Sequence, residues 1–104
     1  MKEIDVSKLK SMKENHEKFI LLDVREKNEI DFANISPHVN ISIGQIPNRY
    51  SELDKNKKIV VMCHSGGRSA NVCQYLEPLG YNVYNLIGGI DAWSKLIDPS
   101  VPIY

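Results

Sequence analysis

Short apolar runs alternate along the chain with amphipathic stretches, and no repeat or low-complexity segment interrupts them. The apolar runs are typical of strands buried on both faces, because helices cover both sides of a parallel sheet. The pattern predicts strands over residues 4–6, 19–24, 39–43, 59–62 and 82–86. It predicts helices over residues 7–15, 26–32, 47–53, 69–79 and 90–96. This alternation indicates an α/β fold with a small, mainly parallel sheet flanked by helices on both faces.

Residues with strong local preferences are expected to set the ends of these helices. Ser7 is a candidate N-cap for the first helix, because its hydroxyl can accept a hydrogen bond from a free backbone N–H. Ser69 is a candidate N-cap for the fourth helix on the same grounds. Gly80 is predicted to end that helix in the left-handed conformation, and Gly88-Gly89 to form the turn before the last helix.

The composition describes an ordinary globular protein of 104 residues, with 13 basic and 13 acidic side chains and no net charge. We expect one domain over residues 1–104. The balanced charge argues against nucleic acid as a partner, because phosphate binding needs a surplus of Lys and Arg. The longest apolar runs, residues 19–22 and 59–63, are far shorter than the roughly 20 residues that cross a bilayer, and residues 1–5 are charged, unlike a signal peptide. A cytoplasmic protein without a membrane partner is therefore expected.

The strongest candidate for chemistry follows the predicted strand 59–62, where the sequence reads Cys63-His64-Ser65-Gly66-Gly67-Arg68-Ser69. Ligands of parallel α/β proteins bind at this position, between the carboxyl end of a strand and the next helix. The two glycines allow backbone N–H groups to turn inward, the helix adds its partial positive charge, and Arg68 adds a cation. Such surroundings lower a thiol pKa from its ordinary value of about 8.5. The sequence therefore predicts that Cys63 is an activated nucleophile.

Two other interpretations of this segment compete with catalysis. A cysteine at the end of a strand is commonly a buried apolar residue, and a Gly-Gly pair can be only a turn. A Gly-rich turn before a helix can also be a nucleotide-binding P-loop, but the pattern Gly-x-x-x-x-Gly-Lys-Ser/Thr is absent. The combination of Cys63, two glycines and Arg68 at one junction favours catalysis over both.

The segment 63–69 resembles the active-site loop of single-domain rhodaneses, Cys-x-x-Gly-x-Arg-Ser/Thr. Two further motifs resemble that family in the same order along the chain. Leu22-Asp23-Val24-Arg25-Glu26 is similar to its Asp-x-Arg-Glu signature, and Gly88-Gly89-Ile90-Asp91-Ala92-Trp93 is similar to its closing Gly-Gly-x-x-Ala-Trp. The resemblance covers nearly the whole chain. It departs at Ala33–His38, where family members usually read Gly-His-Ile-Pro-Gly-Ala.

The resemblance implies a small sulfurtransferase that carries a sulfane sulfur as a persulfide on Cys63. In that mechanism Cys63 attacks the outer sulfur of a donor such as thiosulfate, and the persulfide passes its sulfur to cyanide or to a thiol, including a protein thiol. Backbone N–H groups of residues 65–69 would stabilise the persulfide anion. Arg68 would supply positive charge, or turn away and pair with a carboxylate. His64 would either steer an anionic donor or lie exposed in the loop.

Two alternatives to a sulfurtransferase stay open. One is a persulfide-carrying module that serves a protein partner with little turnover of small molecules. The other is a cysteine-dependent phosphatase. Phosphatase loops on a related fold place five residues between Cys and Arg, whereas this chain places four between Cys63 and Arg68. The shorter loop is tighter, which suits a terminal sulfur better than a phosphate group.

The remaining candidates are interpreted as structural. Asp23 and Arg25 follow a neighbouring strand at the same edge of the sheet, so we expect them to brace the loop through an ion pair or a hydrogen bond. Cys73 is predicted to be buried and inert, and Trp93 to pack in the core. No pair of His or Cys residues has the spacing of metal ligands, so neither a metal site nor a cofactor is expected.

Overall fold

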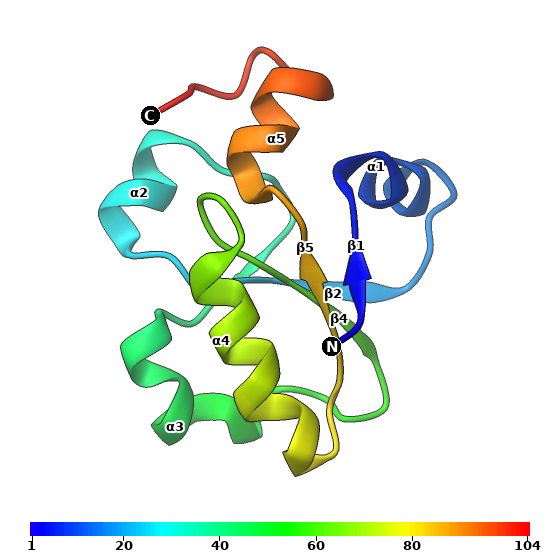
Figure 1. Ribbon diagram of the computed structural model, residues 1–104, viewed down its shortest axis with the longest axis vertical. Coiled ribbons are helices and arrows are strands. Elements are labelled where there is room, and N and C mark those ends of the chain that lie inside the picture. The colour runs from blue at the N-terminus through cyan, green and yellow to red at the C-terminus, as the bar shows by residue number, and fades with distance from the viewer.

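The computed structural model describes all residues, 1–104, as a five-stranded sheet with helices on both sides (Figure 1). The strands are β1 (Glu3–Ile4), β2 (Phe19–Asp23), β3 (Val39–Asn40), β4 (Lys58–Met62) and β5 (Asn82–Leu86). The α-helices are α1 (Val6–Glu14), α2 (Lys27–Phe32), α3 (Ile46–Arg49), α4 (Gly67–Leu76) and α5 (Gly89–Leu96). Three 3-10 turns complete the structure: η1 (Ile43–Gln45), η2 (Tyr50–Glu52) and η3 (Glu77–Leu79). None of the helices has the length and apolar character that crossing a membrane requires.

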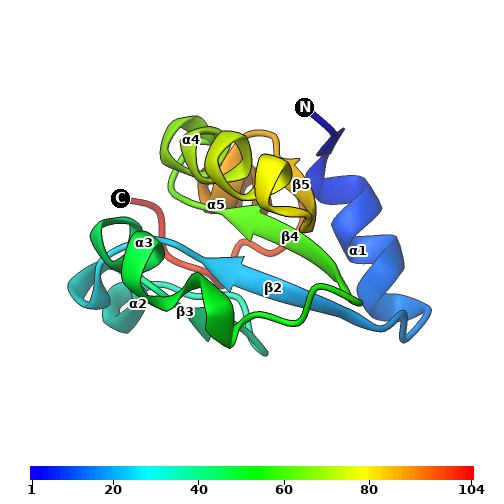
Figure 2. The same ribbon diagram turned by 90° about the horizontal axis from the view of Figure 1, so that it is seen from below.

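The sheet has the strand order β1-β5-β4-β2-β3, and every pair of neighbours is parallel. Along the central strand β4, Ile59 and Val61 belong to one cluster of 13 buried residues, and Val60 and Met62 to another of 11. The first cluster contains buried residues of α3 and α4, and the second contains those of α1 and α5. Figure 1 shows α1 and α5 on one side of the strands and α3 and α4 on the other, and Figure 2 shows β5, β4, β2 and β3 side by side. The predicted α/β class, with a sheet covered on both faces, is confirmed.

The first strand–helix junction lies earlier in the chain than the sequence predicts. β1 ends at Ile4 rather than at residue 6, and Asp5, not Ser7, is the N-cap of α1. The Oδ1 atom of Asp5 accepts a hydrogen bond from the backbone N–H of Lys8 at 2.8 Å. Asp and Ser are about equally good N-caps, and the extended backbone of Asp5 selects the earlier of the two.

The fourth helix also begins earlier than predicted, at Gly67, so the prediction of Ser69 as its N-cap is wrong. Gly66 is the N-cap instead, with a φ of 112° that glycine adopts without steric cost, and this conformation turns the chain directly into the helix. At the other end, the α-helix stops before Pro78, which has no N–H to donate. A single 3-10 turn then leads to Gly80, whose φ of 95° is left-handed, as predicted.

The segment between β3 and β4 is less regular than predicted. The strand expected over residues 39–43 contains only two residues, and the helix expected over 47–53 is the short α3 between two 3-10 turns. The backbone N–H of Ile43 donates to Val24 O at 2.9 Å, and the hydroxyl of Ser42 donates to Arg25 O at 3.3 Å. These bonds to the loop after β2 replace further strand pairing.

Candidate active site

Cys63 lies at the carboxyl edge of the sheet, between β4 and α4, and is only 1% exposed. The backbone N–H of Gly66 donates to its Sγ at 3.1 Å, and the N–H of Ser69 donates at 3.4 Å. The hydroxyl of Ser69 lies 3.3 Å from the same sulfur. The loop therefore directs several hydrogen-bonding groups at one thiol.

These contacts decide the ionisation of Cys63. Burial is the largest single influence and raises the thiol pKa, because a poorly solvated thiolate is unfavourable. The hydroxyl of Ser69 and the backbone N–H groups of Ser69, Gly66 and Ser65 act in the opposite direction. Together they outweigh burial, so the pKa of Cys63 lies below its ordinary value. Hydrogen bonds, rather than a nearby cation, provide the main stabilisation of the thiolate.

Asn85 of β5 holds two members of this loop. The Ser69 hydroxyl donates to Asn85 Oδ1 at 2.5 Å, and Asn85 Nδ2 donates to Gly66 O at 3.2 Å. Asn85 is 5% exposed and Ser69 is fully buried, so water cannot replace these hydrogen bonds as partners of the two polar side chains. The amide therefore fixes the position of the hydroxyl beside Cys63.

The turn before α5 supports the loop on its backbone side. The N–H of Ile90 donates to Cys63 O, and the N–H of Asp91 donates to His64 O, both at 3.0 Å. Gly89 permits this approach: a Cβ on it would lie 2.5 Å from Cys63 O and from His64 O. Gly89 also has a φ of 57°, in the left-handed region. The second Gly-Gly pair is thus part of the scaffold that shapes the loop.

Glu29 of α2 binds the cation of the loop. Its carboxylate accepts hydrogen bonds from Arg68 Nη1 at 2.7 Å and Nη2 at 2.9 Å. It also accepts from the Tyr104 hydroxyl at 2.7 Å and from the Glu26 N–H at 3.1 Å. The bonds from Arg68 are the main reason why the pKa of Glu29 falls to about 2. Of the two orientations expected for Arg68, the structure shows the one paired with a carboxylate.

Asp23 and Arg25 form the expected ion pair, with both side chains fully buried. Arg25 Nη2 lies 2.8 Å from Asp23 Oδ2, and Arg25 Nε donates to Asp23 Oδ1 at 3.0 Å. Arg25 also donates to Ala33 O at 2.7 Å and to the Tyr104 hydroxyl at 2.8 Å. Buried charges need such complete pairing. The segment that departs from the family pattern, Ala33–His38, thus contributes a main-chain oxygen to the site.

His64 is half-buried, so of its two interpretations the exposed loop histidine is wrong. Its ring stacks on Tyr104, with centroids 4.1 Å apart and an interplanar angle of 12°, and its Nε2 atom is buried without a hydrogen-bond partner. The ring of Phe32 meets that of Tyr104 edge-on, with centroids 5.9 Å apart. The last residue of the chain therefore reaches back to the loop, and Figure 1 shows this end of the ribbon next to α2.

Three residues of this network are not among the candidates that the sequence predicts: Glu29, Asn85 and Tyr104. Asn85 carries a weak signal, because it is polar and lies between apolar residues near the carboxyl end of a strand, but Asn82 is polar in the same strand. Glu29 looks like an ordinary acidic residue of a first helical turn, and nothing in the spacing of Tyr104 relates it to the loop. Cys73 and Trp93 are buried, as predicted.

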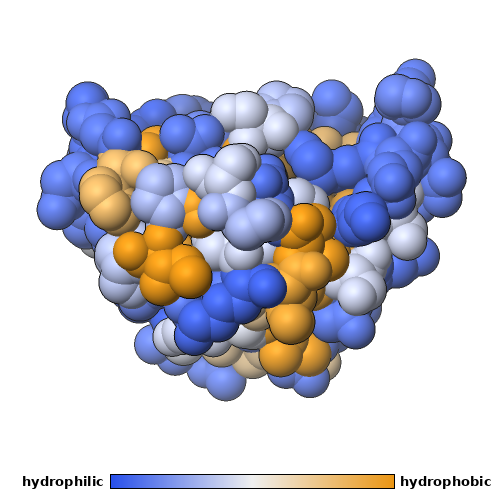
Figure 3. Space-filling model, turned by 90° about the horizontal axis from the view of Figure 1, so that it is seen from above, coloured by the Kyte–Doolittle hydropathy of each residue, from blue (hydrophilic) through white to orange (hydrophobic).

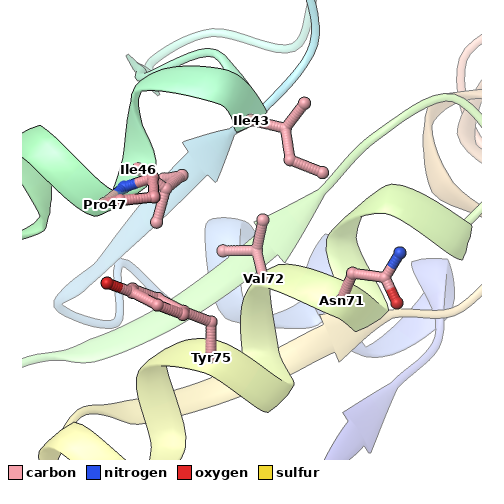
Figure 4. A pocket seen from close by; sticks show the side chains of 6 residues that line it. All are labelled: Ile43, Ile46, Pro47, Asn71, Val72 and Tyr75. Carbon is pink, nitrogen blue, oxygen red and sulfur yellow. The ribbon is translucent and has the colours of Figure 1, made fainter.

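A separate apolar pocket of about 160 Å³ lies between α3 and α4 (Figure 4). Its lining residues are Ile43, Ile46, Pro47, Asn71, Val72 and Tyr75. None of residues 63–69 lines it, so this pocket is distinct from the surroundings of the Cys63 sulfur.

The rhodanese-like domain model matches residues 5–96. The chain belongs to the rhodanese-like family. The chain is 43% identical to "Putative sulfurtransferase YtwF" of Bacillus subtilis (strain 168), over 95% of its own length and 96% of that protein. A protein of Allochromatium vinosum named "Sulfurtransferase" is 38% identical, over 89% of this chain and 88% of its own. The crystal structure of a rhodanese-like domain protein from Staphylococcus aureus superimposes with a TM-score of 0.87 at 31% identity, over 100% and 99% of the two chains.

Proposed function

We propose that this rhodanese-like protein is a sulfurtransferase that carries sulfane sulfur as a persulfide on Cys63. The observation behind the proposal is the set of hydrogen bonds on the Cys63 sulfur, at 3.1 Å from Gly66 N–H and 3.4 Å from Ser69 N–H. They favour a thiolate in a site that is otherwise buried. A thiolate is the form of cysteine that attacks sulfur.

The reaction has two half-reactions. In the first, the Cys63 thiolate attacks the sulfane sulfur of a donor, a new S–S bond forms on Cys63, and the bond between that sulfur and the rest of the donor breaks. With thiosulfate the departing group is sulfite. In the second, an acceptor such as cyanide or a thiolate attacks the outer sulfur of the persulfide and restores the Cys63 thiolate. Such covalent catalysis predicts ping-pong kinetics.

The backbone donors of the loop stabilise both forms of the enzyme in this scheme. The Gly66 and Ser69 N–H groups already donate to Sγ, and the outer sulfur of the persulfide would lie among the same backbone N–H groups of the loop. Because these N–H groups are already oriented before the reaction, no free energy is spent on reorienting them during it. Asp23 and Arg25 act at a distance, by bracing the loop that follows β2.

The mass of the intact protein tests the proposal. After incubation with thiosulfate, the protein is expected to gain the mass of one sulfur atom, and cyanide is expected to remove it. The Cys63→Ala variant should gain nothing, whereas Cys73→Ala, the matched control, should gain sulfur like the wild type. If Cys63→Ala still takes up sulfur, Cys63 is not the carrier.

A second candidate function is a persulfide-carrying module that exchanges sulfur with a protein partner. It is favoured by the 1% exposure of Cys63 and by the pairing of Arg68 with Glu29, which leaves little to attract a small anion. A steady-state assay with thiosulfate and cyanide separates the two. Negligible turnover, together with transfer of sulfur to Cys63 from a persulfidated protein, would favour the carrier.

A further inference from the structure

The outer edge of β2 is only partly covered by β3. β4 pairs with all five residues of β2, from Phe19 to Asp23, whereas β3 pairs with the last two alone. Residues 19–21 therefore have a neighbouring strand on one side and none on the other. Figure 2 shows this first part of β2 beside the end of α1, on the side of the molecule away from the C-terminus. An open strand edge presents backbone groups to which another chain can bind.

The register shows which backbone groups of β2 are free. In a parallel ladder, alternate residues of a strand bond to one neighbour and the residues between them to the other. Asp23 O accepts a hydrogen bond from Ile41 N–H, just beyond β3, so Leu21 and Phe19 point to the same side. No backbone partner meets the N–H and C=O of Phe19 or the N–H of Leu21 at this edge. Leu21 is only 4% exposed, so an added strand would supply a partner that water supplies poorly.

Pro37 explains why β3 does not cover the rest of β2. Val39 pairs with Leu22, so an extension of β3 toward its start would place residue 37 opposite Ile20. In that register the N–H of residue 37 would donate to Phe19 O, and proline has no N–H. The chain therefore cannot close this edge with its own backbone.

Two cavities meet at the open edge. The larger, of about 230 Å³, reaches the end of α1, and the smaller, of about 150 Å³, follows the edge as far as β3. Phe19, Leu21 and Pro37 line both cavities, so together they form one groove along the first part of β2. An extended chain fits such a groove, because its backbone pairs with the edge while its side chains alternate between the two faces of the sheet.

The opposite edge of the sheet is protected. β1 pairs only with the last two residues of β5, which leaves residues 82–84 without a neighbour on that side. Lys2 lies beside them: its Nζ donates to Asn82 Oδ1 and is 4.4 Å from the centroid of the Tyr84 ring. A lysine on an edge hinders the approach of another strand. No cavity is lined by residues 82–84, so the groove is particular to β2.

The groove has an unmatched positive charge at the end of α1. Lys13 lines the larger cavity, where its Nζ donates to Ser36 O at 2.7 Å but forms no ion pair. Glu17, the acidic residue of the same lining, already lies 3.8 Å from Lys58 Nζ. Figure 3 shows hydrophilic side chains gathered over α1, at the right of the view. A carboxylate on the occupant of the groove would match the charge of Lys13.

We propose that this groove binds an extended, acidic peptide segment of a partner protein, which adds to the sheet as a strand parallel to β2. The segment takes the place that β3 leaves open, and its backbone pairs with Phe19 and Leu21. Side chains opposite these two residues lie on the face of the sheet that α1 covers, where a carboxylate meets Lys13. The side chain opposite Ile20 lies on the other face, beside apolar residues.

This docking surface is separate from the Cys63 loop. Phe19 begins β2, whereas Cys63 follows the last residue of β4, and parallel strands place these positions at opposite ends of the sheet. A bound segment therefore leaves the thiol accessible to its own reactants. The proposal concerns recruitment of a partner and does not depend on sulfur transfer.

The probe is the peptide Val-Glu-Val-Glu-Val, acetylated and amidated at its ends, added to isotope-labelled protein and followed by NMR. Its two glutamates match the positions opposite Phe19 and Leu21, and its central valine matches the position opposite Ile20. We expect a Kd of about 1 mM or tighter, and amide hydrogen exchange at Phe19 and Leu21 that is about tenfold slower with saturating peptide. An absence of binding at about 10 mM peptide overturns the proposal.

Two N-methylated peptides separate strand addition from non-specific adhesion. In the proposed register, the N–H of the central valine donates to Phe19 O, whereas the N–H of the first glutamate points away from β2. Methylation of the valine nitrogen should weaken binding by about tenfold, and methylation of that glutamate nitrogen should leave it nearly unchanged. Equal effects of the two methyl groups would show that the peptide does not pair with the edge, and would overturn the proposal.

Charge and self-association provide the remaining outcomes. Lys13→Gln should weaken binding of the peptide by about threefold, whereas Lys8→Gln, which removes a charge from α1 outside the groove, should not. Equal affinities of the two variants would overturn the acidic character assigned to the segment. Sedimentation as a dimer, with slow exchange at Phe19 and Leu21 before any peptide is added, would identify a second copy of this chain as the occupant and overturn the proposal.

Discussion

Cys63 and Cys73 lie ten positions apart in the sequence and share almost every general property. Each is 1% exposed, and both belong to the same cluster of 13 buried residues. Their pKa values nevertheless move in opposite directions. Burial raises the pKa of Cys73 to about 12, whereas the pKa of Cys63 lies below its ordinary value.

The position of each cysteine relative to α4 explains the difference. Cys73 lies inside the helix, where backbone N–H groups are used by the carbonyls one turn earlier. Cys63 precedes the helix, and the N–H groups at a helix start have no partner within it. The N–H of Ser69, in the first turn, is one of these, and it donates to the Cys63 sulfur. Burial alone therefore raises the pKa of a thiol, and free backbone donors lower it again, as the proposed role of Cys63 as a nucleophile requires.

The largest expected contrast is in reactivity toward iodoacetamide. Because its pKa is lowered, Cys63 should be alkylated with a midpoint below the free-thiol value of about 8.5. Cys73, with its pKa of about 12, should remain protonated and unmodified in the folded protein throughout this range. Timed alkylation from about pH 5 to pH 9, followed by peptide mass spectrometry, measures both sites at once. Equal rates at the two cysteines would show that the loop does not activate Cys63.

Gly89→Ala tests whether the loop geometry creates the difference. The new Cβ would lie 2.5 Å from the carbonyl oxygens of Cys63 and His64, and Ala is strained at a φ of 57°. We expect a loss of about 3 kcal/mol in the free energy of unfolding and a higher alkylation midpoint for Cys63. Urea unfolding measures the first effect. Gly44→Ala is the control, because no atom lies within 4 Å of its new Cβ; equal stability of the two variants would refute the steric argument.

The parts of the molecule that the sequence predicts well are local. The apolar run of β4 and the loop that follows it are contiguous, so strand, turn and candidate nucleophile can be inferred together. The end of α4 is also local, because Pro78 and Gly80 act through their own backbone. The start of α4 differs from the prediction because the conformation of Gly66 takes precedence over the capping preference of Ser69.

The partners of the loop side chains are not local. Arg68 and Glu29 are 39 positions apart, and Glu29 and Tyr104 are 75 positions apart. Either orientation of Arg68 is compatible with its own sequence neighbourhood, and only the packing of α2 against the loop selects the paired one. The charge pairing of the site therefore depends on tertiary contacts that spacing does not encode.

The smallest expected effect isolates one hydrogen bond of the reactive cysteine. Ser69→Ala removes the hydroxyl 3.3 Å from the Cys63 sulfur but keeps the backbone N–H. The hydroxyl has one proton, which it donates to Asn85 Oδ1 in this structure and can turn to the Cys63 thiolate instead, so its loss should raise the alkylation midpoint by up to about one pH unit. Asn85 Oδ1 loses its donor, which should cost about 1–3 kcal/mol of stability. Ser94→Ala is a suitable control, because Ser94 is also buried and its hydroxyl has no partner. If Ser94→Ala destabilises as much as Ser69→Ala, lost volume rather than the hydrogen-bond network is responsible for the loss of stability. An unchanged alkylation midpoint in Ser69→Ala would show that the contrast between the two cysteines rests on the backbone donors alone.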